Sequence, residues 1–338
     1  MKRMVRAAAL TNYFEVAQQL ALDPLQMLAQ VGLDRAMLAD PDNRIPAGAV
    51  VTLLEESARA SQCLTFGLRM AETRQLTDLG AVSLLLTHKR TLREVLHAMI
   101  SYRHLMNEAL ALQMEDAGAN VIIREEVVTD VTTHSRQATE LALGVLARAA
   151  GALLGTHWKP HRVMFNHEAP PDLHLHRRIF KCKLAFGSEY NAFVCAAKDL
   201  DYPSSAANPA LARYAEQLLQ SLPKAQDRST SMEVREAIYV LLPMGRATVE
   251  QVAQKLGVNV RTLQRQLEDD GATFSQVINA VRRELAVRYV QSGQHSLGHV
   301  AELLGYSTQT SFTRWFKSEF GVAPREWQPD QAPQRPHS

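Results

Sequence analysis

The 338-residue chain has few cysteines and no long apolar run. Cys63, Cys182 and Cys195 show no paired or metal-like spacing, so the sequence predicts reduced thiols rather than a disulfide framework. No stretch approaches about 18 uncharged apolar residues, which argues against a membrane span. The basic start leads into an apolar run that Asn12 and Glu15 interrupt, which indicates a soluble helix rather than a secretory signal. We therefore expect a cytoplasmic protein without a membrane partner.

Motifs for catalysis and cofactor binding are also missing. There is no Gly-rich phosphate loop, and Gly187-Ser188 lacks the strand–Gly-x-Ser-x-Gly–helix context of a nucleophile elbow. His174 and His176 have the spacing of a metal pair, but no further ligand follows at zinc-like spacing. We interpret them as surface imidazoles beside two arginines. The sequence thus predicts no catalytic residue, no metal site and no cofactor.

The chain also lacks an excess of one charge. Its net charge is +2, and residues 231–330 contain eleven Lys and Arg against eleven Asp and Glu. This balance counts against the strongly basic footprint of a DNA-binding module. DNA binding would therefore depend on local concentrations of positive charge, which we expect on two helix faces described below and at Arg282-Arg283.

The most informative stretch is residues 297–320, which predicts two short helices joined by a tight turn. Ser296 is a good N-cap, and Gly305 allows the left-handed residue that ends the first helix. On the second helix one side is aromatic and the other is polar and basic. The aromatic side carries Phe312, Phe316 and Phe320, and the polar side Thr310, Thr313, Arg314 and Lys317. A short braced helix with such an outer face suits reading a DNA major groove.

Residues 248–271 repeat this pattern. Their apolar stripe and Gly257 match the first helix of the other unit at a constant offset of 48, and Leu263-x-Arg265-x-Leu267 matches Phe312-x-Arg314-x-Phe316 at 49. One helix pair is a weak signal, because many helical proteins contain such pairs by packing alone. Two copies in register, each with Gly at the turn and Arg outside, favour DNA binding.

A long helix is predicted between the two copies. An apolar stripe from Phe274 to Tyr289 indicates a helix from about Thr273 to Gln291, roughly 28 Å long. Major-groove faces recur about every 34 Å along DNA, so a rigid spacer of this length suits two readers on one side of a duplex. The stretch can also be a core helix of an ordinary helical bundle, and this interpretation is compatible with its role as a spacer. Residues 232–242 predict the first helix of this all-α domain.

Residues 1–205 predict an α+β domain, mostly helical with a small sheet. Strands are expected as a hairpin within 112–128 and at 161–166 and 191–195. A loop is expected at 41–46. Helices are expected at 47–60, 91–109, 137–154 and 172–180.

Residues 206–231 predict a helix followed by a polar linker, and residues 331–338 a disordered tail. Asn208-Pro209 caps the helix. Its apolar seam comprises Leu211, Tyr214, Leu218 and Leu222. The seam suits packing against a partner or against its own domain, and the sequence leaves both open.

Residues 232–328 closely resemble the DNA-binding domain of the AraC/XylS family of bacterial transcription regulators. The resemblance is carried by V-x-x-V-A-x-x-L-G-V-N-V-R-T-L-Q-R-Q-L in the first unit and by the ending Phe-Lys-x-x-Phe-Gly-Val-x-Pro-x-x-Trp. It implies a seven-helix domain, residues 232–330, with two helix-turn-helix units joined by a long helix. Pro324 resembles the first residue of the closing helix. Residues 1–205 more loosely resemble the effector-binding, dimerising domain of one branch, through Gly-Leu-Asp at 32–34, Arg44-Ile45-Pro46 and Arg178-x-Phe-x-Cys182.

These observations predict a sequence-specific transcription regulator, which we expect to be an activator. Arginine can donate two hydrogen bonds to guanine and glutamine can bind adenine at two atoms, whereas phosphate contacts fix register. The predicted base contacts are Arg261, Gln264 and Arg265 in one groove, and Gln309, Thr310, Ser311 and Arg314 in the next. The predicted phosphate contacts are Thr248, Ser296 and Lys317.

The expected partners are double-stranded promoter DNA, a second copy of the chain, a small-molecule effector and, for an activator, RNA polymerase. The sequence does not identify the effector and leaves an amino acid, a fatty acid and an aromatic compound open as candidates. Apolar strands with few convergent polar residues favour one that is partly apolar. Two alternatives stay open: a ligand-independent dimeric regulator, and an enzyme with a helical interaction domain.

Overall fold

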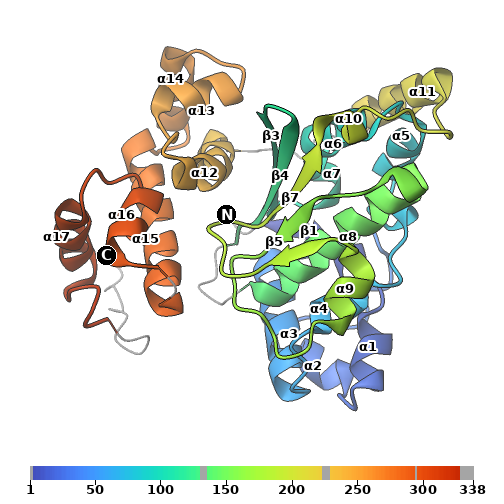
Figure 1. Cartoon of the computed structure of the whole chain (residues 1–338), viewed down its shortest axis with the longest axis horizontal. Coiled ribbons are helices and arrows are strands. Elements are labelled where there is room, and N and C mark those ends of the chain that lie inside the picture. The colour runs from blue at the N-terminus through green and yellow to red at the C-terminus, as the bar shows by residue number, and fades with distance from the viewer. Residues whose placement is uncertain (1–2, 130–134, 223–228, 294, 328–338) are drawn as a thin grey trace. The chain divides into compact units, whose positions relative to one another are not determined.

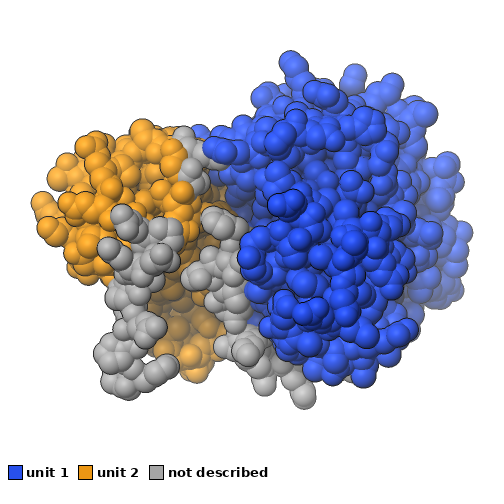
Figure 2. Space-filling view, turned by 90° about the horizontal axis from the view of Figure 1, so that it is seen from below, with its two compact units in different colours: residues 1–226 blue, residues 227–338 orange. Residues whose placement is uncertain are grey.

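The computed structural model describes residues 3–129, 135–222, 229–293 and 295–327. The chain divides into two compact units, residues 1–226 and 227–338 (Figure 2). The first unit mixes helices with small sheets and the second is helical, which confirms the predicted fold class. The expected disordered tail, 331–338, lies outside the described residues, as does most of the expected linker.

The first unit contains a five-stranded sheet, whose strands lie together in Figure 1. The strand order is β3-β4-β7-β5-β6, antiparallel except for the parallel pair β5–β6. The predicted hairpin is confirmed, since β3 and β4 pair from Leu110–Val127 to Ala117–Asn120 around Gly118. The other two predicted strands are confirmed as β5 and β7. The strands are β3 (Leu110–Ala117), β4 (Asn120–Val127), β5 (Arg162–Met164), β6 (Lys183–Ala185) and β7 (Ala192–Ala196).

Two further strands lie where sequence analysis expected a helix and a loop. β1 (Met4–Arg6) pairs antiparallel with β2 (Arg44–Pro46), so those two expectations were wrong. Val5 and Ile45 face each other in this ladder and both are buried. A three-residue strand contains little more than one side-chain period, and its partner lies far away in the chain. Local pattern therefore cannot reveal it.

The central helix of the first unit is α8 (Arg136–Leu154), which packs against α3, α4 and β4. The approach of α4 to α8 requires glycine. A Cβ at Gly67 would lie 2.0 Å from the carbonyl oxygen of Gln137, and one at Gly144 would lie 2.5 Å from the Ala71 Cβ. By length and composition residues 136–157 form a helix apolar enough to cross a membrane, but 61% of its apolar window is buried inside the protein.

Other helices and short turns complete the first unit. The helix predicted at 91–109 is interrupted at Tyr102, which separates α6 from α7. The α-helices are α1 (Tyr13–Gln19), α2 (Pro24–Gln30), α3 (Ala47–Ala60), α4 (Phe66–Ala71), α5 (Val82–His88), α6 (Leu92–Ser101), α7 (Arg103–Met106), α9 (His174–Phe180), α10 (Ala197–Leu200) and α11 (Pro209–Ser221). Short 3-10 turns are η1 (Ala7–Leu10), η2 (Leu76–Leu79) and η3 (Gly155–His157).

Helix α11 belongs to the first unit and packs against α5. It buries the face formed by Ala212, Ala215 and Leu219. The adjacent face, one residue round the helix, leaves Leu211, Tyr214 and Leu218 exposed by 45%, 59% and 49%. Most of the predicted seam therefore points away from its own unit.

The second unit contains the two predicted helix pairs and the long helix between them. α12 packs against α15, and Arg235 on α12 forms an ion pair with Glu284 on α15. Pro324–Glu326 form a turn instead of the start of a closing helix, and residues beyond Trp327 lie outside the described part. The elements are α12 (Thr230–Leu241), η4 (Leu242–Met244), α13 (Val249–Lys255), α14 (Val260–Asp269), α15 (Phe274–Ser292), α16 (Leu297–Leu303) and α17 (Gln309–Phe320).

Candidate functional site

The two helix pairs of the second unit, α13–α14 and α16–α17, begin with the same device. The hydroxyl oxygen of Thr248 accepts a hydrogen bond from the amide of Gln251, 3.3 Å away, at the start of α13. Ser296 does the same for the amide of His299, at 3.2 Å, at the start of α16. Each hydroxyl uses its oxygen as the cap acceptor and keeps its own hydrogen for donation.

The turns and second helices also match. Gly257 and Gly305 have φ of +70° and +73°, a left-handed conformation that a Cβ would strain. The side chain of Asn259 then caps α14 and that of Thr308 caps α17, at 2.8 and 3.1 Å from the amides they accept from. The repeated spacing seen in the sequence is thus a repeated local structure.

The inner faces of α14 and α17 fix the direction of their outer faces. Leu263 and Leu267 of α14 are fully or almost fully buried, and so are Phe312 and Phe316 of α17. Phe316 also contacts the Trp327 ring edge-on, with centroids 5.7 Å apart. Because these inward residues are held by packing, each helix must turn its polar side to solvent.

All ten predicted contact residues are exposed. On α14 they are Arg261, Gln264 and Arg265; on α17 they are Gln309, Thr310, Ser311, Arg314 and Lys317; Thr248 and Ser296 are the two N-caps. Ser311 is partly engaged, since its hydroxyl lies 2.9 Å from that of Thr308. The side chains of the three arginines and Lys317 make no hydrogen bond or ion pair with any described residue.

Other arginines of this unit are engaged internally. Arg283 forms an ion pair with Glu319 at 3.2 Å, and Arg282 donates to the carbonyl oxygen of Leu304 at 3.0 Å. Both side chains are half-buried. The Arg282-Arg283 pair therefore stabilises the fold instead of adding to an outer positive patch. Residues 231–330 contain equal numbers of basic and acidic residues, but this count does not show which cations are paired internally and which are exposed.

Two helix-turn-helix units joined by a long helix, each with an unpaired arginine on its second helix, define a DNA-binding transcription regulator. Comparison with known families agrees. Residues 22–204 match the family described as "Arabinose-binding domain of AraC transcription regulator, N-term", and residues 252–329 match a helix-turn-helix domain family. The chain belongs to the AraC family of transcription regulators, and is a regulator instead of an enzyme.

Similar proteins match over most of the chain. The HTH-type transcriptional regulator VirS of Mycobacterium tuberculosis is 29% identical over 326 residues, 96% of each chain. The ornithine utilization regulator of Pseudomonas aeruginosa is 23% identical over 77% of each chain. The crystal structure of the regulator CdpR from Pseudomonas aeruginosa aligns over 93% of this chain and 96% of its own, with 20% identity and a TM-score of 0.45.

The first unit contains an apolar cavity of about 140 Å³. Its wall is formed by β1, η1, α3, η2, α6, α7, the start of β3, β4 and α8. Glu125 of β4 is among the lining residues and is 3% exposed. Burial raises the pKa of its carboxyl to about 8. No motif in the sequence marks this residue, although it occupies the same face of the strand as the buried Val121 and Ile123.

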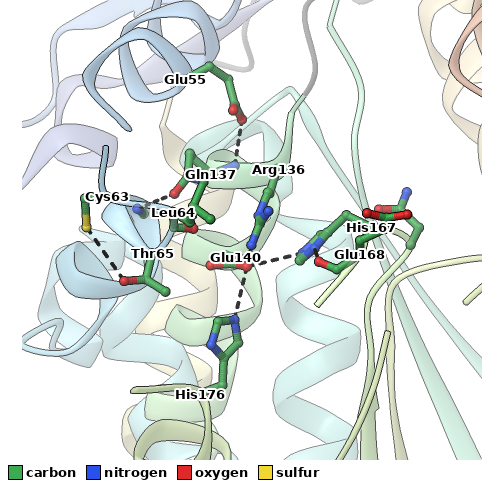
Figure 3. Close-up of polar contacts among 12 residues, drawn as sticks. Glu55, Cys63, Leu64, Thr65, Arg136, Gln137, Glu140, His167, Glu168 and His176 are labelled. Carbon is green, nitrogen blue, oxygen red and sulfur yellow. Dashed lines mark hydrogen bonds and ion pairs between the residues drawn. The ribbon is translucent and has the colours of Figure 1, made fainter. Parts of the chain in front are cut away.

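A second buried polar group lies on the other side of α8. The carboxylate of Glu140 lies 3.1 Å from Nε2 of His176 and 3.3 Å from Nε2 of His167, and Arg136 is 3.5 Å away (Figure 3). His176 is fully buried, so its interpretation as a surface imidazole was wrong; His174 is exposed. Glu140 is an acidic residue in a mostly apolar helix, and this feature of the sequence could have indicated a buried polar group. Within the described residues no His, Cys, Asp and Glu cluster suits a metal ion.

Proposed function

We propose that this protein is a cytoplasmic, effector-controlled regulator that reads two successive major grooves of promoter DNA with α14 and α17. Residues 1–205 form the effector and dimerisation domain, and residues 232–330 the DNA-binding domain. The supporting observation is the pair of unpaired, exposed arginines, Arg265 and Arg314, at matched places on the two second helices. An unpaired guanidinium can donate to guanine without first breaking an internal ion pair.

The roles follow from position on each helix. Arg261, Gln264 and Arg265 contact bases in one groove. Gln309, Thr310, Ser311 and Arg314 contact bases in the next. Thr248, Ser296 and Lys317 contact phosphates, the first two through the hydroxyl hydrogens that capping leaves free. The long helix α15 has 19 residues, so its length is about 28 Å, within reach of one turn of DNA.

Selection of bound genomic fragments by the full-length protein identifies the operator, and gel-shift titration then tests the arginines. Arg265→Ala or Arg314→Ala should weaken binding to the selected site by about 1–3 kcal/mol. Arg177→Ala is the matched control, because it removes one exposed positive charge from the first unit. Equal affinities for all three variants and the parent protein would refute the assigned roles.

We also propose that the protein is a homodimer that joins through the exposed seam of α11. Leu211, Tyr214 and Leu218 recur at helical spacing on one face, so the same face of a second copy can cover it. Tyr214→Glu should shift the mass measured by light scattering from dimer to monomer. Leu25→Glu, at a similarly exposed apolar residue on α2, should leave the dimer intact. A dimeric Tyr214→Glu protein would exclude this interface.

For the direction of control we propose activation with RNA polymerase as partner. In vitro transcription from a selected promoter tests this, because an activator raises the amount of transcript when added with polymerase. A fall in transcript would show a repressor. A regulator that needs no ligand is the second candidate, and it predicts the same DNA affinity with and without effector.

A further inference from the structure

Glu125 is held on the wall of the apolar cavity without a partner for its carboxyl. Its backbone is fixed by the β4 ladder, and its amide donates to the carbonyl oxygen of Asn191 at 3.0 Å. The side chain is 3% exposed, and Oε2 has no hydrogen-bond partner among the described residues. A buried acceptor or acid in this situation is costly, because folding removes water from it and supplies nothing in return.

The other charged groups of the cavity wall are already matched. Arg6 donates to Asp42 at 2.7 Å and to the carbonyl oxygen of Asp78 at 2.8 Å. The terminal nitrogens of Arg74 donate to the carbonyl oxygens of Ala8 and Ala9, and only its Nε is left over. The carboxylate of Asp78 accepts from the amide of Gln75. Arg103 also has an interaction partner.

Apart from Asn107, whose side-chain oxygen accepts from the amide of Ala109 at 2.9 Å, the rest of the wall is hydrocarbon. It includes Val51, Leu54, Met99, Leu112, Leu141 and Val145. The volume of about 140 Å³ is close to that of the roughly 150 Å³ apolar cavity known to hold benzene. A sugar, nucleotide or phosphate would bring many polar groups for which this wall has no partners. The space suits one ring or a short chain with a single polar end.

We propose that this cavity binds a small apolar molecule with one basic amine, whose ammonium group donates to the carboxylate of Glu125. The inference rests on the proposed effector control and specifies the chemistry of the effector. A charge-assisted bond between ammonium and carboxylate is stronger than one between neutral groups. It satisfies the carboxyl of the cavity wall for which the described residues supply no partner, while the hydrocarbon wall covers the rest of the ligand.

Binding of such a ligand should release a proton. Burial raises the pKa of Glu125 to about 8, so the empty site carries a neutral acid near pH 7. The ammonium ion favours the carboxylate, and the proton of Glu125 leaves to solvent. The other charged groups on the wall are the carboxyl of Asp78, which lies beside Arg74, and the guanidinium groups of Arg6, Arg74 and Arg103. Burial lowers the pKa of Arg74 to about 10.

The test uses three probes with the same ring: benzylamine, benzyl alcohol and benzoate, titrated calorimetrically into the full-length protein. Benzylamine should bind at least about tenfold more tightly than the alcohol, the factor separating charged from neutral hydrogen bonds. Its affinity should rise by up to about tenfold from pH 6 to pH 7, as expected when one proton is released. Benzoate tests the rival, an acidic ligand at the free Nε of Arg74.

Glu125→Gln keeps the shape of the side chain and removes the acid, so it should abolish both the preference for benzylamine and its pH dependence. Glu55→Gln is the matched control. Glu55 is a half-buried residue whose carboxyl has a pKa raised to about 7 by burial, but this carboxyl accepts from the amide of Gln137 and is not on the cavity wall. The Glu55→Gln variant should bind benzylamine with the same affinity and pH dependence as the parent protein. If Glu125→Gln fails to fold, Ala142→Leu provides the test. Its larger side chain fills the cavity and should block binding of all three probes.

Tighter binding of benzoate, absence of binding by all three probes, or unchanged selectivity in Glu125→Gln would each overturn the inference. Fluorescence anisotropy with a selected DNA fragment is measured alongside, with and without benzylamine. Intact DNA binding with no amine binding removes this inference alone. If the parent protein does not bind DNA, the proposed function is overturned, but the calorimetric result for the cavity still stands.

Discussion

Replacement of Glu125 by glutamine should change how the stability of the first unit depends on pH. The pKa of Glu125 is about 8 in the folded protein against 4.5 for the unperturbed group, because burial penalises the carboxylate. Between these values the folded state holds a proton that the unfolded state has lost, so rising pH favours unfolding. The slope is about 1.4 kcal/mol per pH unit, and over the whole interval the cost is roughly 5 kcal/mol.

Glu125→Gln removes this proton and hence the slope. The free energy of unfolding of the variant, relative to the parent, should therefore rise by about 1.4 kcal/mol per unit between pH 5 and pH 8, then level off. Amide hydrogen exchange in β4, measured by mass spectrometry in increasing urea, reports this unit separately from the other. The difference between the two proteins cancels groups they share, such as Glu55. Parallel stability curves over this range would show that Glu125 ionises freely in the folded protein.

The second unit yields three further expectations. Lys317→Ala should weaken binding to all DNA sequences alike and reduce the slope of log affinity against log salt by about one, measured by anisotropy at several salt concentrations; a selective loss at the operator would assign it to bases. Phe316→Ala should destabilise this unit by about 3–5 kcal/mol in urea unfolding, because the ring is fully buried among aromatic neighbours. Thr308→Ala removes the cap of α17 and should cost about 1 kcal/mol in the same assay, whereas Thr308→Ser should cost little.

The helix-turn-helix units could be predicted because their signals are local. Ser296, Gly305 and Phe312 lie within 17 residues, and each acts on backbone or packing within a turn or two. The sequence also showed which residues would face outward, since burial of Phe312 and Phe316 leaves Arg314 only the solvent side. It could not show that Arg283 is paired, because Glu319 lies 36 positions further along.

The first unit shows the opposite case. The hairpin β3–β4 was visible because its strands are adjacent in the chain, whereas β1 and β2 were not, since Val5 and Ile45 meet across forty residues. His176 was assigned to the surface because nothing near it in the chain announces Glu140, its partner on α8. Burial by distant elements, not local composition, decides whether such a polar residue is solvated.

Sequence alone determined the two-unit plan, the duplicated helix pairs and the polar faces on α14 and α17, because caps, turn glycines and helical periodicity act over a few residues. Only the tertiary structure decided which cations remain unpaired and which carboxyl is enclosed by hydrocarbon. Those properties depend on which distant atoms come within a few ångströms, and pairing and desolvation exist only once the chain has folded.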